Sequence, residues 1–344
     1  MNEKLQGDMA TVPEALPHDV LVERLARLAD QSLALWDLPD GVTARLINLS
    51  ENATYLVENS AGYRSVLRIH REGYHTRQAI SCELAWMRGL NDSDAVITPQ
   101  TIPGLDGEDI QSAALEGVLS RRFMVMFAFV EGVEPSEDED LVEPFEELGE
   151  IAARTHLHSI SWKRPPNFER LTWDFEHMLG SRPNWGDWRE APAMNSAGRA
   201  VLERQAALIE KRLAAFGTGP ERFGLIHADM RLANLLVLDN SPRLIDFDDC
   251  GLGWFGYDFA AGISFMEDHP QVPDLKMAWV KGYRKIRELP QADENEIDTF
   301  VSLRRMVLLA WIGSHSETDL AKEQGAEFTR VSVELAETYL QNFS

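Results

Sequence analysis

Residues 224–260 read GLIHADMRLANLLVLDNSPRLIDFDDCGLGWFGYDFA and contain most of the information on the fold of this 344-residue chain. Within them, His227, Asp229 and Asn234 stand in the pattern H-x-D-x-x-x-x-N. This frame places an imidazole, a carboxylate and a carboxamide within eight residues. A three-residue pattern also arises by chance, so its interpretation depends on the sequence that follows it.

Two apolar runs come directly after this frame, at 235–238 and 243–247. The residues between them, Asp-Asn-Ser-Pro, are typical of a turn, so the two runs predict a β-hairpin. Asp246 lies at the exit of the second strand, and the hairpin folds it back towards Asn234. The hairpin therefore brings Asp229, Asn234 and Asp246 to one place.

These three residue types suit phosphoryl transfer. One carboxylate is needed to orient the acceptor hydroxyl and take its proton, a role that fits Asp229. A carboxamide and a second carboxylate supply hard oxygen ligands for Mg²⁺ against the nucleotide phosphates, a role that fits Asn234 and Asp246. His227 is expected to brace the loop. The alternative reading is purely structural, with His227 a core histidine and Asp229 a turn former.

The segment before Gly132 predicts a small, mostly antiparallel sheet with one helix inserted after its third strand. A loose tail, 1–19, precedes a helical segment from 20 to 36. The predicted strands are 44–49, 54–58, 65–70, 99–104 and 119–130, and the inserted helix is 76–90.

After Gly132 the pattern becomes helical. We expect helices at 141–159 and 197–216 and further helices after residue 262, including the apolar stretch 301–312. Residues 162–189 are irregular and hold four of the nine tryptophans. The prediction is an α+β chain with two lobes: an N-terminal nucleotide-binding lobe, 20–127, and a larger catalytic and substrate lobe, 128–344.

The composition excludes several classes of partner. The net charge of −23 disfavours nucleic acid and anionic membrane surfaces. The longest apolar stretch, 123–130, is far shorter than the ~20 residues of a membrane helix. Cys82 and Cys250 are too few for a disulfide framework, and the N-terminus does not resemble a signal peptide. We therefore expect a cytoplasmic protein, whose oligomeric state the sequence does not indicate.

The stretch 224–260 resembles the catalytic and metal-binding loops of the aminoglycoside phosphotransferase and choline kinase-like family, whose members have a protein-kinase-like fold. The similarity is strongest to the branch of type II homoserine kinase-like proteins and the bacterial stress-response serine/threonine kinase. It extends to SVLRIHREGYHTRQAISCELAWM and LTWDFEHMLGSRPNWGDWRE and covers roughly residues 20 to 340. The resemblance implies a phosphotransferase that uses ATP or GTP with Mg²⁺.

The resemblance also implies a nucleotide site in the N-terminal lobe. The family places a lysine on the third strand and a glutamate on the next helix, and the matching residues here are Arg68 and Glu83. No lysine occurs between Lys4 and Lys163, so Arg68 is expected to hold the phosphates in its place. A surface salt bridge is the alternative.

Three further residues match nucleotide-binding positions of the family. Asn52 lies in the glycine-free loop 50–54, which either contacts phosphate or is a plain hairpin turn. Met126 and Ala128 match the hinge where adenine bonds to the backbone.

In the C-terminal lobe, Arg231 matches the position from which many kinases neutralise the transferred phosphoryl group; simple solvent exposure is the alternative. Asp258 matches a residue that braces the catalytic loop. Asp248 is expected to assist metal or substrate binding; capping of the following helix is the alternative.

The acceptor is expected to meet the tryptophan-bearing segment 162–189. Trp173 and Asp174 would hold an amine-bearing molecule through cation–π and ionic contacts, unless the segment forms a small satellite core. Only twelve residues separate Asp246 from Asp258, too few for an activation loop of the kind that orders a peptide. We therefore predict a small-molecule hydroxyl acceptor, with a stress-response-type protein kinase or a non-catalytic pseudokinase scaffold as alternatives.

Overall fold

The computed structural model describes residues 17–344 except 51, 117, 136–139, 240 and 315–318. Most of the predicted tail 1–19 therefore lies outside the described residues, as does Glu51 of the predicted phosphate loop. The chain forms two compact units. The first runs to Tyr74 and resumes at Pro103–Met126, and the second comprises His75–Ile102 and Phe127–Ser344.

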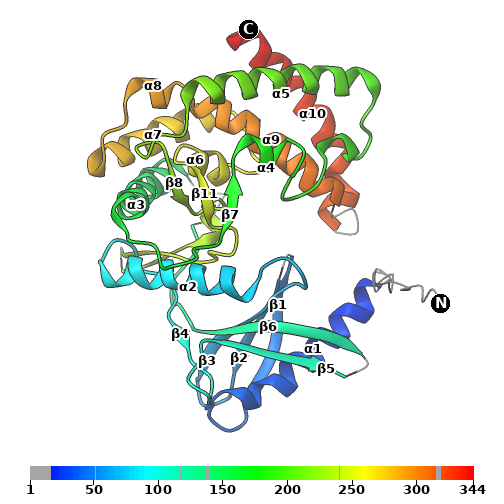
Figure 1. Ribbon diagram of the computed structural model, residues 1–344, viewed down its shortest axis with the longest axis vertical. Helices are drawn as coiled ribbons and strands as arrows, with labels where there is room; N and C mark the ends of the chain where they lie inside the picture. Colours follow the sequence, from blue (N-terminus) through cyan, green and yellow to red (C-terminus); the bar gives the residue numbers. More distant parts are fainter. Residues whose placement is uncertain (1–16, 51, 117, 136–139, 240, 315–318) are drawn as a thin grey trace, which may run out of the picture. The chain divides into compact units, whose positions relative to one another are not determined.

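The first unit is built on an antiparallel sheet, drawn in blue and teal in Figure 1. Strands β1, β2 and β3 pair in sequence order, and β6 joins β3 on one side and β5 on the other. Helix α1 packs against β1 and β5. The bounds are α1 His18–Ser32, η1 Leu33–Leu35, β1 Thr43–Leu49, β2 Ala53–Glu58, β3 Arg64–Ile69, β5 Ile110–Leu115 and β6 Leu119–Ala128.

These elements confirm the first three predicted strands within one residue at each end. Strand β5 was not predicted. It pairs with β6 through a register that shifts between Ala113 and Leu115, so its polar and apolar residues do not alternate regularly. Helix α1 begins at His18, two residues before the expected start.

Helix α2, Arg77–Asp92, follows the predicted helix closely, and the hydroxyl of Thr76 caps its N-terminus. It belongs to the second unit, whereas the expected lobe boundary at residue 127 placed it in the first. The reason lies in its long-range contacts. Trp86 donates to His158 of α3, and the guanidinium of Arg170 donates to the carbonyl of Ala79.

The second unit is mainly helical, with two small sheets at its centre. One sheet is the predicted hairpin β9–β10, and the other has the order β7–β11–β8. The bounds are β4 Thr101–Ile102, α3 Val142–Ser161, β7 Leu171–Trp173, α4 Phe175–Met178, η2 Trp188–Glu190, α5 Ser196–Phe216, β8 Phe223–Ile226, η3 Leu232–Asn234, β9 Leu235–Leu238, β10 Ser241–Leu244, β11 Gly251–Trp254, α6 Tyr257–Gly262, α7 Val272–Ile286, α8 Gln291–Glu294, α9 Ile297–Ser314 and α10 Asp319–Phe343.

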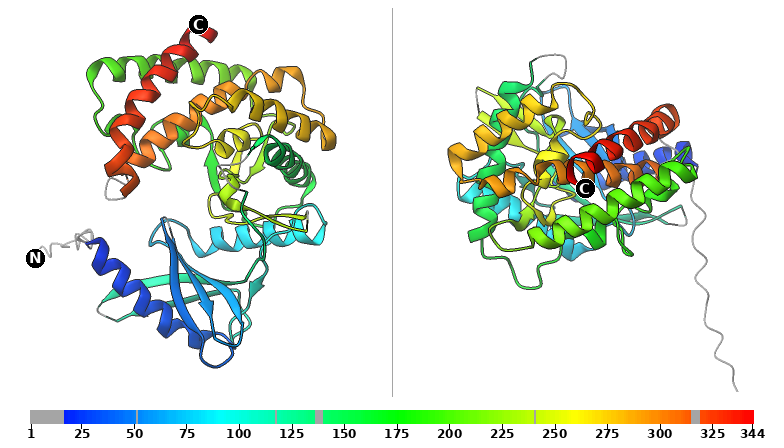
Figure 2. Two further views of the ribbon diagram at one scale, coloured as in Figure 1. Left: turned by 180° about the vertical axis from the view of Figure 1, so that it is seen from behind. Right: turned by 90° about the horizontal axis from the view of Figure 1, so that it is seen from above.

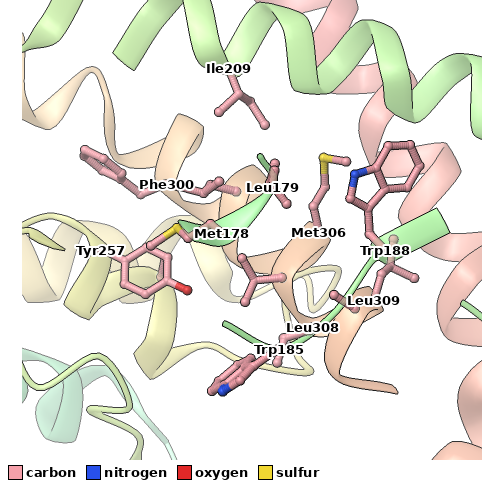
Figure 3. Close-up of a cluster of buried hydrophobic side chains, with 14 of the residues drawn as sticks. Met178, Leu179, Trp185, Trp188, Ile209, Tyr257, Phe300, Met306, Leu308 and Leu309 are labelled. Atoms are coloured by element: carbon pink, nitrogen blue, oxygen red, sulfur yellow. The ribbon is translucent and has the colours of Figure 1, made fainter. Parts of the chain in front are cut away.

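The core of this unit lies between α9 and the helices and loops that surround it. Helices α5 and α10 pack on each other and on α9 (Figure 2). Figure 3 shows Met306 of α9 beside Trp188, and Leu308 of the same helix beside Trp185. Burying aromatic and aliphatic side chains of this size stabilises the unit by roughly 1.5–3 kcal/mol each. Within the described part of the chain, no helix is both long enough and apolar enough to span a bilayer.

Candidate active site

The loop that carries His227, Ala228 and Asp229 begins where strand β8 ends. Asp258, in the first turn of α6, accepts hydrogen bonds from the backbone amides of His227 at 3.2 Å and Ala228 at 2.8 Å. Ala228 has φ +65°, in the left-handed region that an alanine rarely adopts. The Asp258 carboxylate therefore holds a strained loop in one conformation, which fits the bracing role implied for it.

His227 is fully buried and supports the same loop. Its Nδ1 accepts from the amide of Asp229 at 3.3 Å, and its Nε2 lies 3.0 Å from the carbonyl of Ile245. Burial lowers the pKa of His227, against the opposing effect of the nearby carboxylates, so the ring is neutral and donates from Nε2. The imidazole thus ties the loop to the end of the hairpin β9–β10, as a bracing residue would.

Asp229 projects its carboxylate into a cluster of donors. Oδ1 accepts from Arg231 at 3.1 Å and from Arg304 at 3.0 Å, and Oδ2 accepts from Asn234 at 2.9 Å. Burial raises the pKa of Asp229, but the guanidinium groups of Arg231 and Arg304 outweigh it, so the pKa lies below its ordinary value. An ionised carboxylate, already bonded to these donors, is therefore present at neutral pH.

The hairpin brings the predicted metal ligands close to this carboxylate. Leu235 pairs with Leu244, and the amide of Ile245 donates to the carbonyl of Asn234 at 2.9 Å. Asp246 follows directly, exposed and at φ +59°, a conformation that aspartate tolerates better than most residues. The structure thus bonds Asn234 to Asp229 and places the residue before Asp246 against the backbone of Asn234, while the metal-binding roles of Asn234 and Asp246 stay predictions.

The side-chain oxygens of Asn234 and Asp246 are suitable ligands for a hard divalent cation whose other ligands come from water and phosphate. Asn234 donates a hydrogen bond from Nδ2 to Asp229, so its side-chain oxygen Oδ1 is the atom that can bind a cation. Within the described residues, no group of three or more His, Cys, Asp or Glu side chains is arranged to hold a metal. Asn234 and Asp246 would therefore need water and phosphate oxygens to complete the shell, which is how Mg²⁺ is commonly bound.

Arg304 is a site residue that the sequence analysis missed. It lies on α9, 75 positions beyond Asp229, and its side chain is only 2% exposed. Its guanidinium also donates to the carbonyl of Ala228 and to Ser264 and lies over the ring of Trp185. The only signal was the pair Arg304-Arg305 inside the apolar stretch 301–312, where buried charges require partners.

Three of the predicted nucleotide residues belong to the first unit. Arg68 is buried in β3, opposite Thr54 of β2. Asn52 is also buried, and its Oδ1 accepts from the amide of Arg71 at 3.1 Å, which supports the turn reading of loop 50–54. The side chain of Met126 is fully buried in β6.

The other two predicted nucleotide residues belong to the second unit. Glu83 is fully buried, with its carboxylate 3.8 Å from the guanidinium of Arg170. The amide of Ala128 donates to the carbonyl of Gln100 at 2.8 Å, so a hinge contact from Ala128 would use its carbonyl oxygen. The pairing of Arg68 with Glu83 stays a prediction.

The predicted acceptor residues divide into core and partly exposed groups. Trp173 is fully buried: its indole donates to the carbonyl of Asp249 and packs edge-on against Trp185. This burial corrects the expectation that its ring face meets the acceptor and favours the satellite-core alternative. Asp174 is partly exposed and caps α4 through the amide of His177.

Asp248 is buried beside His75, whose Nε2 lies 2.9 Å from the Asp248 carbonyl and 3.5 Å from its carboxylate. The guanidinium of Arg170 also donates to the carbonyl of Asp248. The backbone of Asp248 is thus fixed within the second unit. Its carboxylate remains a proposed metal or substrate group.

Comparison with known proteins agrees with this geometry. Residues 43–292 match the model of the Phosphotransferase enzyme family, and the chain belongs to this family. The solved microcompartment-associated aminopropanol kinase is 42% identical, with a TM-score of 0.85 over 92% of this chain and 98% of its own.

Two amicoumacin kinases are more distant relatives. That of Bacillus subtilis (strain 168) is 26% identical over 236 residues, 66% of this chain and 67% of its own. An amicoumacin kinase solved in complex with AMP-PNP, Ca2+ and Ami is 20% identical, with a TM-score of 0.73 over 93% of this chain and 95% of its own.

The chain is therefore a phosphotransferase enzyme with a kinase-like α+β fold, related to small-molecule kinases. This confirms the fold class, the family and the enzyme class predicted from residues 224–260. The narrower resemblance to the homoserine kinase-like and stress-response branch stays a prediction.

Proposed function

We propose that the enzyme transfers the γ-phosphoryl group of ATP, or GTP, with Mg²⁺, to the hydroxyl of a small amino alcohol such as aminopropanol. The observation that carries this proposal is the 42% identity to an aminopropanol kinase across 92% of the chain. The site supports it, because an ionised Asp229 accepts a hydrogen bond from Asn234, one of the two proposed metal ligands.

In this reaction each residue has a separate task. Asp229 accepts a hydrogen bond from the acceptor hydroxyl, aligns its oxygen with the γ-phosphorus, and receives its proton as the new O–P bond forms and the β–γ bridge breaks. Asn234 and Asp246 would hold Mg²⁺, whose charge stabilises the phosphate oxygens. Arg231 would neutralise the transferred group, and Arg68, with Glu83 as its proposed partner, would hold the α- and β-phosphates.

The charge of the chain fits an amine-bearing acceptor. A net charge of −23 attracts cations to the protein surface and repels anionic competitors. Asp174 is a partly exposed carboxylate of the segment 162–189, and Asp248 is the other carboxylate considered for the acceptor. We propose that one of these two groups meets the ammonium of the acceptor.

The test is a phosphotransfer screen followed by ³¹P NMR, with ATP and GTP as donors. The acceptors are 1-amino-2-propanol, ethanolamine, choline, homoserine, an aminoglycoside and a generic protein substrate. Isopropylamine lacks the hydroxyl and 2-propanol lacks the amine, so neither should be phosphorylated. Efficient labelling of protein without small-molecule turnover would establish the protein-kinase alternative, and nucleotide binding without any transfer would establish the scaffold.

A further inference from the structure

The carboxylate of Asp229 is surrounded by donors. Its Oδ1 accepts from Arg231 and Arg304 at 3.1 and 3.0 Å, and its Oδ2 accepts from Asn234 and Arg231 at 2.9 and 3.2 Å. A carboxylate offers about four lone-pair sites. The single Nε–H of Arg231 is shared between both oxygens, so Arg231, Arg304 and Asn234 together cover these sites. An acceptor hydroxyl can therefore donate to Asp229 only after one of the present donors has moved away.

Two of the donors are fixed by their surroundings. Arg304 is 2% exposed and is also held by the carbonyl of Ala228 at 3.2 Å and by Ser264 at 2.8 Å. Asn234 is buried, and its Nδ2 donates to the backbone carbonyl of Asp229 at 2.8 Å as well as to its carboxylate. Moving either one would break several buried hydrogen bonds at once.

Arg231 differs from both. Its side chain is 39% exposed, and its described side-chain contacts are with Asp229 alone. Releasing Arg231 breaks only its contact with Asp229, whereas moving Arg304 or Asn234 would break further buried hydrogen bonds. Arg231 is therefore the donor that an incoming hydroxyl displaces most easily.

We propose that Arg304 is a positioning residue that fixes one oxygen of Asp229, and that the acceptor hydroxyl takes the place of Arg231 on this carboxylate. This inference rests on the proposed role of Asp229 in the reaction. The displaced guanidinium, two residues from Asp229, is then released to meet the transferred phosphoryl group. Binding of the acceptor hydroxyl to Asp229 is thus coupled to the movement of the Arg231 guanidinium towards the phosphoryl group.

The first experiment compares Arg304 with its neighbour Arg305. Arg305 is a matched control, because it lies on the same helix and pairs in a buried site with Glu267 at 2.6 Å. With ATP and 1-amino-2-propanol, Arg304→Met should lower kcat at least tenfold while the KM for ATP stays within about twofold. Arg304→Lys should recover part of the loss, and Arg305→Met should stay within about twofold of the original kcat.

The second experiment tests the exchange at Arg231. Arg231→Met should lower kcat because the phosphoryl group loses its counter-charge. The KM for 1-amino-2-propanol should fall or stay unchanged, because the acceptor no longer has to displace a donor. A clear rise of this KM in Arg231→Met would contradict the exchange, and an unchanged kcat in Arg304→Met would contradict the positioning role.

A third measurement does not depend on the acceptor. In a double-mutant cycle of urea unfolding, Arg304→Met and Asp229→Asn should couple by more than tenfold in the unfolding equilibrium constant. Arg305→Met and Asp229→Asn should be additive. If the original enzyme phosphorylates nothing in the screen, the proposed function fails, and this cycle still decides whether Arg304 holds Asp229: additivity in the first pair would overturn the inference.

Discussion

The imidazole of His156 and the carboxylate of Asp258 form a fully buried pair, with Nε2 2.9 Å from Oδ2. On the other side of the ring, Nδ1 lies 3.0 Å from the hydroxyl of Tyr283, to which Arg287 donates at 2.6 Å. Burial lowers the pKa of His156 more than Asp258 raises it, so the ring is neutral and donates from Nε2. Helices α3 and α7 thus hold the carboxylate that braces the catalytic loop.

The first prediction concerns this carboxylate. Asp258→Asn should lower the free energy of unfolding by about 3 kcal/mol, because it breaks a buried pair and turns an acceptor into a donor facing the amide of Ala228. It should also lower kcat, since the loop loses its brace. Urea unfolding and steady-state kinetics measure the two effects. Asp298→Asn removes an exposed partner of Lys276 and should cost less than about 1 kcal/mol.

If Asp258→Asn and Asp298→Asn were equally stable, Asp258 would not stabilise the catalytic loop. An unchanged kcat together with lower stability would limit Asp258 to a folding role.

The second prediction is the pH dependence of stability. Burial lowers the pKa of both His156 and His227 in the folded protein. Below the ordinary histidine pKa of about 6.5, the unfolded chain therefore binds protons that the folded protein does not. Stability should be fully present above that pH and decline as the pH falls towards 5.5. Each histidine adds at most about 1.4 kcal/mol per pH unit to the slope.

Urea unfolding at pH 7.5, 6.5 and 5.5 measures this slope. His156→Gln should be less stable at pH 7.5 but show a shallower decline, because one titrating group has been removed. A slope unchanged by this substitution would mean that His156 does not contribute to the acid sensitivity.

Much of the fold and of the site could be predicted because the signals are local. The frame of His227, Asp229 and Asn234, the two strands of the hairpin and the position of Asp246 all lie within twenty residues. The sheet β7–β11–β8 could not be predicted from the sequence, because its short strands pair with strands up to 80 positions away. Each strand alone is too brief to show a period.

Arg304 was missed for a related reason. Its partners in the catalytic loop are Asp229 and Ala228, both more than 70 positions away, and no motif connects them to Arg304. Trp173 was misinterpreted because a tryptophan near carboxylates fits a binding face as well as a core. Only the three-dimensional packing against Trp185 and Tyr257 distinguishes the two. Long-range pairing, which sequence periodicity does not reveal, therefore decides these positions.

The third prediction concerns the packing of α3 on α7. A Cβ added at Gly282 would overlap the carbonyl of Glu146, and one added at Gly149 would overlap the carbonyl of Trp279. Gly282→Ala should therefore destabilise the protein by about 2 kcal/mol or more, despite the higher helix propensity of alanine. Thermal unfolding measures the loss. Met277→Ala, at an exposed position of the same helix, is the control and should change stability by less than about 0.5 kcal/mol.

The fourth prediction separates the chemistry from the binding of the metal–nucleotide complex. Asp229→Asn keeps the size of the side chain but removes its charge, so it should leave the affinity for Mg·AMP-PNP within about threefold. The same change should lower kcat by two orders of magnitude or more, because the acceptor hydroxyl loses its proton acceptor. Asp246→Ala should instead weaken Mg·AMP-PNP binding at least tenfold, since a carboxylate ligand is lost.

Calorimetry with Mg·AMP-PNP and steady-state kinetics measure the two quantities, with Glu210→Gln on α5 as a control that removes one exposed carboxylate. If Asp229→Asn retained near-normal turnover, Asp229 would not be the base, and the pairing of roles proposed for Asp229 and Asp246 would be wrong.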